Sequence, residues 1–270
     1  MWTTALLVIV PTALFVGLVF VIHRNLAPQG GWLRSMEDAG EIFSTVGTGL
    51  AVLIAFLIVA AFGHYQEARD AVGKEAVAVQ QQYVMATYFD EADSDALQGE
   101  VICYARAVVE DEWPAMQRGS DSDRVQGWVD AMDGTMREAS VGDQKQVEAL
   151  AHWFDVSNDR QEARRARLAE SKPFVPDFLW AALILISIVV LGYQLLMIDP
   201  AVGTVGQAYS MAAMALTVFA ALAVVYMVDR PFNDRGAEIN HSRMYKAIEV
   251  MSHRLPSSVP CTSDGTPTLS

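Results

Sequence analysis

Residues 42–63 read IFSTVGTGLAVLIAFLIVAAFG, a run without a single charged residue. An α-helix rises about 1.5 Å per residue, so about 20 residues cross the roughly 30 Å hydrocarbon core of a bilayer. The apolar runs of buried helices in soluble proteins are usually shorter, about 10–14 residues. The length of this stretch therefore predicts a membrane-spanning helix.

Three further charge-free runs cover residues 3–22, 178–198 and 201–228. The mean hydropathy of the 270-residue chain is positive, +0.23, although its net charge is −13. The apolar residues are thus concentrated in the four runs, and the charges lie between them. We predict an all-α membrane protein with four transmembrane helices. The spans cover about residues 4–22, 43–63, 177–198 and 207–228.

The first run is expected to be a retained span rather than a secretory signal. The segment starts MWTT, with no Lys or Arg before the apolar residues, and it lacks a small-residue cleavage site. The four spans divide the chain into five segments. These are a transmembrane hairpin (1–63), an acidic helical domain (64–173), a second hairpin (174–228), a helix (229–254) and a tail (255–270). The tail is rich in Ser, Thr and Pro, a composition that predicts disorder.

The distribution of Lys and Arg near the span ends predicts the orientation. Four spans place both termini and residues 64–173 on one side of the membrane. Nine such residues lie on that side: Arg69, Lys74, Arg160, Arg164, Arg165, Arg167, Lys172, Arg230 and Arg235. The opposite side carries only Arg24 and Arg34. We predict a multi-pass protein of the plasma or inner membrane, with cytoplasmic termini and a cytoplasmic acidic domain.

The second apolar run continues past Gly63 as HYQEARDAVGKEAVAVQQQYVMATYF, which contains no proline. Apolar residues keep helical spacing in it, at Ala71, Val72, Ala76, Val79, Tyr83 and Ala86. The pattern predicts one helix over about residues 44–89, about 65–70 Å long. Further helices are predicted over about residues 95–116, 125–138, 143–170 and 236–254. The 143–170 helix carries Val147, Leu150, Ala151 and Phe154 on one face.

No catalytic constellation stands out. None of the five histidines lies in an HExxH pattern, and the chain has no GxxxxGK[ST] loop. Cys103 and Cys261 form no CxxC pair, and no His and Cys cluster has the spacing of a metal site. We expect two reduced cytoplasmic thiols. We predict no enzyme activity, no cofactor, no metal and no nucleic-acid partner.

The spans carry no Lys, Arg, Asp, Glu or His in their cores. Proton-coupled transporters usually need such groups, so the absence argues against a proton-driven carrier. The spans are then either inert anchors or the walls of a pore with an apolar constriction. Thr48, Val52 and Phe56 lie at i, i+4 and i+8 on one face of the second span. This face either packs closely on another helix or forms part of an apolar ring around an axis.

Two charged clusters each have two interpretations. The stretch DEADSD at 90–95 either binds a cation or caps the following helix at Asp93 or Ser94. It lacks EF-hand spacing, which favours the cap. The arginines at 160–167 either meet anionic lipid or pair with acids such as Glu162 on the same helix.

Short motifs occur in a characteristic order between residues 40 and 253. They are Phe56, Glu75, Tyr104, Glu112-Trp113-Pro114, Arg165, Arg167, Pro176, Trp180 and Asp229-Arg230-Pro231-Phe232. In this order and spacing the chain resembles the bestrophin-like bacterial membrane proteins grouped as DUF4239.

The resemblance implies a fold and, through the more distant bestrophins, a function. Bestrophins are pentameric ion channels, mostly for chloride, with four spans per subunit, cytoplasmic termini and a hydrophobic neck lined by the second span. Aligned by its aromatic residue, that neck would consist here of Thr48, Val52 and Phe56. The acidic calcium clasp of animal bestrophins has no counterpart in the chain.

Residues 64–173 carry 22 acidic residues against 12 Lys and Arg. A ring of such domains would attract cations, so the sign of the permeant ion stays open. The sequence supports two hypotheses. The first is a homo-oligomeric ion channel, pentameric by resemblance, whose partners are the lipid bilayer and inorganic ions. The second is a non-conducting membrane scaffold or signalling protein whose cytoplasmic helices bind a partner.

Overall fold

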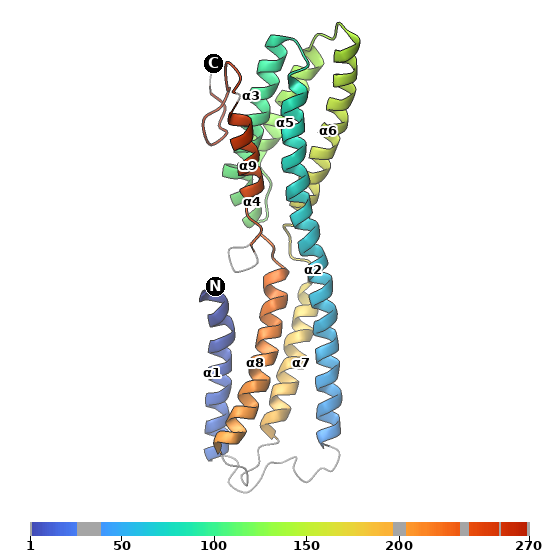
Figure 1. Cartoon of the computed structure of the whole chain (residues 1–270). Coiled ribbons are helices and arrows are strands. Elements are labelled where there is room, and N and C mark those ends of the chain that lie inside the picture. Colours follow the sequence, from blue (N-terminus) through green and yellow to red (C-terminus); the bar gives the residue numbers. More distant parts are fainter. Residues whose placement is uncertain (1, 26–38, 197–203, 233–237, 254, 269–270) are drawn as a thin grey trace. The chain divides into compact units, whose positions relative to one another are not determined.

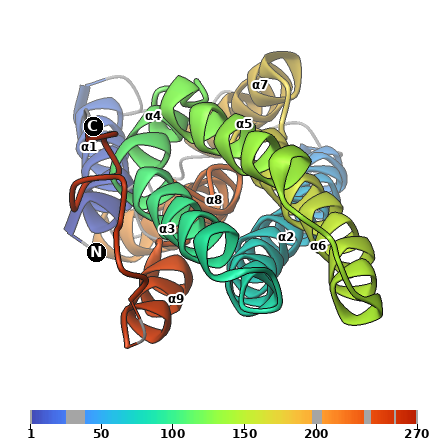
Figure 2. The same cartoon turned by 90° about the horizontal axis from the view of Figure 1, so that it is seen from above.

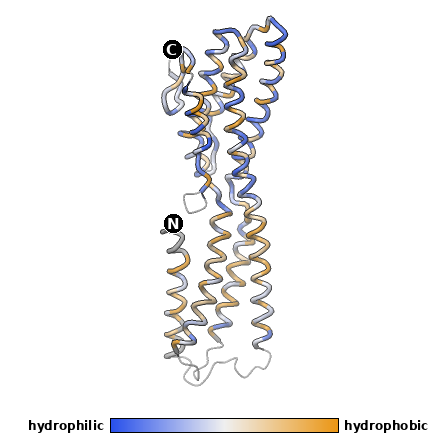
Figure 3. The backbone as a smooth tube through the Cα atoms, viewed as in Figure 1, coloured by the Kyte–Doolittle hydropathy of each residue, from blue (hydrophilic) through white to orange (hydrophobic). Residues whose placement is uncertain are grey.

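The structure is a computed structural model that describes residues 2–25, 39–196, 204–232, 238–253 and 255–268. These residues form helices, joined by turns, and one isolated β-bridge, so the predicted all-α class is confirmed for the described chain. The chain divides into two units. We call Met1–His64 with Pro173–Arg230 the apolar unit, and Tyr65–Lys172 with residues 231–233 and 238–270 the polar unit. Figure 3 shows the contrast in hydropathy between them.

Four helices contribute to the apolar unit. They are α1 (Trp2–Asn25), the first part of α2 (Ala39–Ala86), α7 (Asp177–Leu196) and α8 (Thr204–Val228). Within this unit α8 lies between α1 and α7 (Figure 1). Among the described residues α2, α7 and α8 are long and apolar enough to cross a membrane, whereas α1 shows a shorter apolar stretch, Val8–Leu18. The predicted loop over residues 23–41 and the hairpin over 199–206 fall largely outside the described residues.

One stripe of each helix forms the core of the apolar unit. The stripes contain Leu50, Ile54 and Leu57 on α2, Leu183 and Val190 on α7, and Ala215, Val218 and Val225 on α8. The outside is apolar as well, with Leu185 63% exposed. A large apolar exterior is unfavourable in water and fits lipid as the solvent.

The polar unit contains the second part of α2 and six shorter elements. They are α3 (Glu91–Ala107), the π-helical turn η1 (Val108–Glu112), α4 (Trp113–Gln117), α5 (Asp123–Glu138), α6 (Gln144–Ala169) and α9 (Ser242–Ser252). Seen from above, α3 packs between α5 and α9 (Figure 2). The core combines apolar residues of all the longer helices. Trp153 of α6 packs edge-on against Phe89, with ring centroids 6.4 Å apart.

The long predicted helix is confirmed. Helix α2 runs without a break for 48 residues, about five residues earlier at its start and three at its end than the spacing predicts. All six residues of its predicted apolar stripe are buried in the polar unit: Ala71, Val72, Ala76, Val79, Tyr83 and Ala86.

Two predicted features of the other helices are wrong. Helix α3 begins at Glu91 with Asp90 in the N-cap position, not at Asp93 or Ser94. On α6 the predicted apolar face is only partly buried, since Leu150 packs against the core while Val147 is 49% and Phe154 50% exposed. The buried face of α6 contains Ala149, Trp153, Val156, Ser157, Arg160, Ala163, Arg164 and Arg167. Hydrophobicity alone misplaced this face, because its buried positions include arginines that have polar or acidic partners.

The C-terminal tail also differs from the prediction. Residues 255–268 fold against the polar unit instead of being disordered, and the indole N–H of Trp128 donates to the carbonyl of Gly265 at 2.9 Å. Cys103 and Cys261 form a disulfide, so the expectation of two reduced thiols is wrong for this structure. The two cysteines are 158 positions apart, and no local pattern reveals such a pairing.

Candidate functional site

The predicted neck residues lie on an exposed face of α2 in the apolar unit. Val52 is 50% and Phe56 71% exposed, and Thr48 is exposed as well. Leu50 and Ile54, on the opposite face, are buried in the core. A single copy of the chain therefore leaves the predicted neck face uncovered.

Hydroxyl groups at the start of this face bond to their own helix. The hydroxyl of Thr48 donates to the carbonyl of Ser44 at 2.7 Å, and that of Thr45 donates to the carbonyl of Glu41 at 2.9 Å. Hydroxyls satisfied in this way need no water. The face thus presents apolar groups and satisfied hydroxyls, without a charge.

The polar unit contains a set of buried polar side chains that we call the ionic cluster. Its members are Glu75 on α2, Tyr104 on α3, Glu112 at the end of η1, and Arg164 and Arg167 on α6. Arg167 is at the centre: its Nε donates to Glu75 Oε2 and its Nη2 to Glu112 Oε2, both at 2.5 Å. The Tyr104 hydroxyl donates to Glu75 Oε1 at 2.7 Å. One guanidinium group thereby links three elements, and the tyrosine adds a fourth.

Arg164 connects the ionic cluster to α5. Its Nη2 donates to Glu112 Oε1 at 2.6 Å, and its Nη1 donates to Gln126 Oε1 at 2.9 Å. The backbone amide of Ser122, the N-cap of α5, also donates to Glu112 Oε1, at 3.4 Å. Glu112 therefore accepts hydrogen bonds from both arginines and from the start of a helix.

The electrostatics of the ionic cluster favour its charged pairs. Burial by itself raises the pKa of Glu112, but the charges and hydrogen bonds of Arg167 and Arg164 outweigh burial and lower this pKa below its ordinary value. Burial by itself lowers the pKa of Arg167, while Glu75 and Glu112 raise it above its ordinary value. Burial, followed by the charge of Glu75, raises the pKa of the Tyr104 phenol. Two carboxyl groups, two guanidinium groups and a neutral phenol thus satisfy one another.

The π-helical turn positions Glu112. Pro114 has no backbone N–H, and in a regular α-helix its ring clashes with the carbonyl four residues earlier. The chain widens just before this proline, and the amide of Trp113 bonds to the carbonyl of Val108, five residues back. Such turns often occur at functional positions. The extra residue sets the direction in which the Glu112 side chain leaves the helix.

Arg160 is a further fully buried arginine of the same face of α6. Its Nε donates to Gln82 Oε1 at 2.6 Å, and its guanidinium carbon lies 4.5 Å from the ring centroid of Tyr104. No ion pair of Arg160 occurs among the described residues. The aromatic ring therefore takes the place of an acid as its partner, as in other cation–π pairs.

Other motif residues secure the chain where it re-enters the polar unit after α8. Trp113 packs edge-on against Phe232, with ring centroids 5.6 Å apart. The carbonyl of Pro231 accepts from the amide of Ile239, ahead of α9, at 2.7 Å. Pro114 is solvent-exposed, and its effect is on the backbone.

A second group of motif residues lies within the apolar unit. Asp229 is fully buried at the end of α8, and its Oδ1 accepts from the amide of Val175 at 2.7 Å. The carbonyl of Pro176 accepts from the amide of Trp180 in the first turn of α7, at 3.3 Å. The indole of Trp180 meets the ring of Tyr226 edge-on, with centroids 6.2 Å apart. These contacts hold one end of α7 against one end of α8.

The structure brings five predicted motif residues together: Glu75, Tyr104, Glu112, Trp113 and Arg167. Arg165 is not among them, since it is exposed on α6, and its neighbour Arg164 occupies the buried position instead. Sequence reasoning missed the roles of Arg160, Arg164 and Gln82. The sequence does indicate that these arginines of α6 share one face with Trp153. The spacing of Trp153, Arg160, Arg164 and Arg167 is helical.

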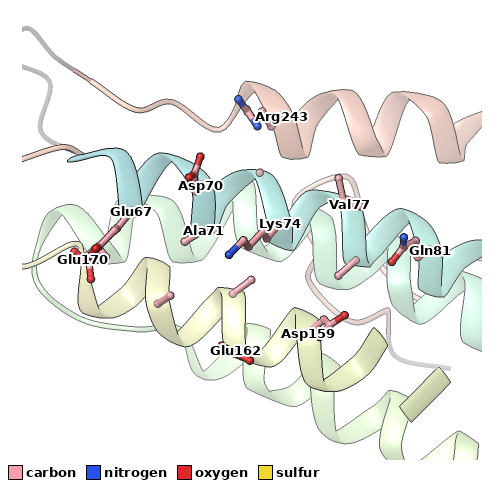
Figure 4. A pocket seen from close by; sticks show the side chains of 14 residues that line it. Glu67, Asp70, Ala71, Lys74, Val77, Gln81, Asp159, Glu162, Glu170 and Arg243 are labelled. Atoms are coloured by element: carbon pink, nitrogen blue, oxygen red, sulfur yellow. The ribbon is translucent and has the colours of Figure 1, made fainter. Parts of the chain in front are cut away.

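A groove with a volume of about 900 Å³ lies within the polar unit between α2 and α6. Acidic side chains of both helices line it, with Lys74 and with Arg243 of α9 nearby (Figure 4). The labelled acids are Glu67, Asp70, Asp159, Glu162 and Glu170. The acidic excess favours a basic partner in this groove.

The acids at 90–95 hydrogen-bond to neighbouring segments. Asp90 accepts from the side chain of Gln146 at 2.9 Å, and Asp93 accepts from the amide of Ser140 at 3.2 Å. Among the described residues no group of three or more His, Cys, Asp or Glu is arranged to hold a metal ion. These contacts favour the structural interpretation of the acidic stretch.

Long apolar helices, an apolar exterior and a separate helical unit held by buried ion pairs define a helical membrane protein. The family described as "Bestrophin-like domain" matches residues 9–236, which is most of the chain, and the chain therefore belongs to the bestrophin-like family. The resemblance predicted from the motifs is confirmed. No curated protein matches the chain. Cys261 and the folded tail lie beyond the matched region.

Proposed function

We propose that this protein is the subunit of an oligomeric ion channel of the bestrophin type, with α2 lining an apolar constriction at Val52 and Phe56. The observation that carries the proposal is the exposed, charge-free face of α2. Family membership supports it, because bestrophins line their neck with the second span. Four spans, a pentameric ring and cytoplasmic termini belong to the same proposal.

The character of this α2 face supports a pore rather than a simple anchor. Large apolar side chains at Val52 and Phe56 are preceded by hydroxyls at Thr45 and Thr48. An apolar ring gates by excluding water. The hydroxyl oxygens near its mouth donate to their own helix and keep lone pairs that can accept hydrogen bonds from water. The same face on neighbouring subunits would surround the axis.

The ionic cluster gives α2 a rigid support in the polar unit. Arg167 and Tyr104 both bond to Glu75, so that part of α2 is held to α6 and α3. We expect this role to be positional, because each charged group of the cluster already has its partner within the cluster.

Ion flux into liposomes tests the proposal. Purified full-length protein in liposomes with a potassium chloride gradient across the bilayer is expected to conduct, and the direction of the current gives the sign of the ion, because potassium and chloride moving down parallel gradients carry opposite currents. The substitutions Val52→Ala and Phe56→Ala together widen the constriction, so the flux is expected to rise severalfold.

Leu185→Ala is the matched control, because Leu185 is a similarly exposed apolar residue on α7. This variant is expected to conduct like the wild type. Absence of flux in both the wild type and the double variant, with the protein shown to be folded, counts against the channel. A change in flux with Leu185→Ala alone would place the pore along α7 instead.

The acidic groove supports a second candidate function. A scaffold or signalling protein would use the groove between α2 and α6 to bind a basic segment of a partner. Mass measurement in mild detergent separates the two candidates. A closed ring of subunits favours the channel, whereas a monomer or dimer favours the scaffold.

A further inference from the structure

The folded tail, residues 255–268, crosses the surface of α3 and α5, and we call it the C-terminal strap. Side chains of both helices bond to its backbone. Trp128 donates to the carbonyl of Gly265 at 2.9 Å, and Arg106 donates to the carbonyl of Thr262 at 3.2 Å. The disulfide between Cys103 and Cys261 is its only covalent attachment to α3 among the described residues.

Two glycines allow the strap to approach the helix closely. A Cβ atom on Gly99 of α3 would lie 2.7 Å from the ring of Pro260 and 3.0 Å from the carbonyl of Ser258. Gly265 has a φ of +77°, and a Cβ atom there would lie 2.5 Å from the backbone nitrogen of Ala107. The glycines at positions 99 and 265 therefore allow the strap to pack closely against α3, where any larger residue would clash.

The strap also has a compact local structure. Cys261 forms a β-bridge with Pro267, and the amide of Thr262 donates to the carbonyl of Thr266 at 2.9 Å. The amide of Thr268 donates to the carbonyl of Pro260 at 3.0 Å. The strap can therefore leave its seat as a unit when its attachment to α3 is broken.

The presence of a disulfide conflicts with the predicted location of the polar unit. The bias of Lys and Arg predicts that this unit faces the cytoplasm. Disulfides there are rarely permanent and are usually catalytic or redox-sensing. Cys261 lies on the C-terminal strap, which packs closely against α3. A reversible disulfide is compatible with both the bond seen in the structure and the predicted cytoplasmic location of the polar unit.

We propose that Cys103 and Cys261 form a thiol–disulfide switch that fastens and releases the C-terminal strap. A dithiol reductant of the thioredoxin class supplies the electrons. Its thiolate attacks the sulfur of Cys261, the less buried of the two, and the disulfide bond breaks. The electron pair leaves on the Cys103 sulfur, which takes up a proton. The second thiolate of the reductant then displaces Cys261 as a thiol and closes the reductant's own disulfide.

The position of Cys103 gives the switch a route into the polar unit. Cys103 is followed in the chain by Tyr104, whose hydroxyl holds Glu75 of the ionic cluster. Fastening the strap constrains α3 next to this contact, and release removes that constraint. The inference rests on the strap, the two cysteines and the proposed cytoplasmic orientation, and it does not require that the protein conduct ions.

Thiol trapping in intact cells tests the redox step. The chain has two cysteines, so alkylation with a heavy maleimide adds either two labels or none. Growing cells are expected to yield a doubly labelled fraction that disappears on treatment with a thiol oxidant and returns when the oxidant is washed out. Full oxidation in untreated cells that persists in the presence of dithiothreitol would overturn the switch, and so would thiols that stay reduced under the oxidant.

Hydrogen exchange of the full-length protein in mild detergent tests the release. In the reduced form the indole N–H of Trp128, which bonds to the carbonyl of Gly265 on the strap, is expected to exchange at least tenfold faster than in the oxidised form, while the amide of Ala139 at the end of α5 stays unchanged. Cys261→Ser is expected to match the reduced wild type under both conditions. Equal exchange in the oxidised and reduced forms would show that the disulfide does not hold the strap, which contradicts the proposal.

Discussion

Arg167 and Arg165 stand two residues apart on α6 in opposite environments. Arg167 is fully buried and pairs with Glu75 and Glu112, whereas Arg165 is exposed. Arg167→Met leaves two carboxyl groups without their central partner. We expect it to destabilise the protein by about 3–5 kcal/mol, because removing one member of a buried ion pair leaves uncompensated charge.

Denaturant unfolding of the full chain in mild detergent, followed by circular dichroism, measures this loss. Arg165→Met serves as the control and is expected to change stability by no more than about 0.5 kcal/mol. Equal losses for the two variants would mean that the ionic cluster does not stabilise the polar unit.

The pKa of Glu112 leads to a prediction about acid. Because Arg167 and Arg164 lower this pKa in the folded protein, Glu112 contributes stability above about pH 4.5, the ordinary carboxyl value. That contribution is lost as the pH falls through the lowered folded value. The wild-type unfolding temperature is therefore expected to decrease below pH 4.5 more steeply than that of Glu112→Gln. Parallel pH profiles for the two proteins would contradict the assignment.

At this scale the sequence anticipated part of the ionic cluster. Glu75, Tyr104, Glu112 and Arg167 could be named from motif order. Their common location could not, because it depends on how four separate elements pack. Arg164 was passed over in favour of Arg165, although the spacing from Trp153 places Arg164 on the buried face.

Among the elements, α2 was the most predictable and α6 the least. The apolar stripe of α2 has helical spacing over its whole length, so its continuity followed from periodicity. On α6 the buried face mixes Trp153 with arginines, and an apolar count selects instead the neighbouring face with Phe154, which is half exposed. The π-helical turn before Pro114 could not be predicted from the sequence pattern. A proline indicates that the helix is interrupted or distorted, but it does not indicate which kind of turn results.

Two glycines distinguish a helix interior from a strained turn. Gly127 lies within α5, where an added Cβ atom would meet no neighbour within 4 Å, whereas Gly119 has a φ of +82°. Gly127→Ala is expected to stabilise the protein by about 0.5–1 kcal/mol through helix propensity. Gly119→Ala is expected to destabilise it by about 1 kcal/mol, because alanine disfavours that backbone conformation.

Thermal unfolding of the two single variants beside the wild type tests this pair. Shifts of opposite sign are expected. A lower unfolding temperature for Gly127→Ala would show that the exposed side of α5 is covered in the assembled protein.

At the scale of the whole molecule, sequence reasoning predicted a helical membrane protein and its family, and the family match confirmed the latter. The disulfide and the folded strap escaped it, because both depend on contacts between residues distant in the chain. The residues of the predicted neck face, in contrast, were named from their spacing in the sequence. Their exposure in a single copy of the chain agrees with a surface that neighbouring copies cover.

Cross-linking between copies tests most directly whether α2 faces an axis. The measurement uses Phe56→Cys in a chain whose own cysteines are changed to serine, oxidised in native membranes, with Leu185→Cys on α7 as the control. The account predicts covalent dimers for the Cys at position 56 and none for the Cys at position 185. Dimers at position 185 with none at position 56 would contradict a pore lined by α2.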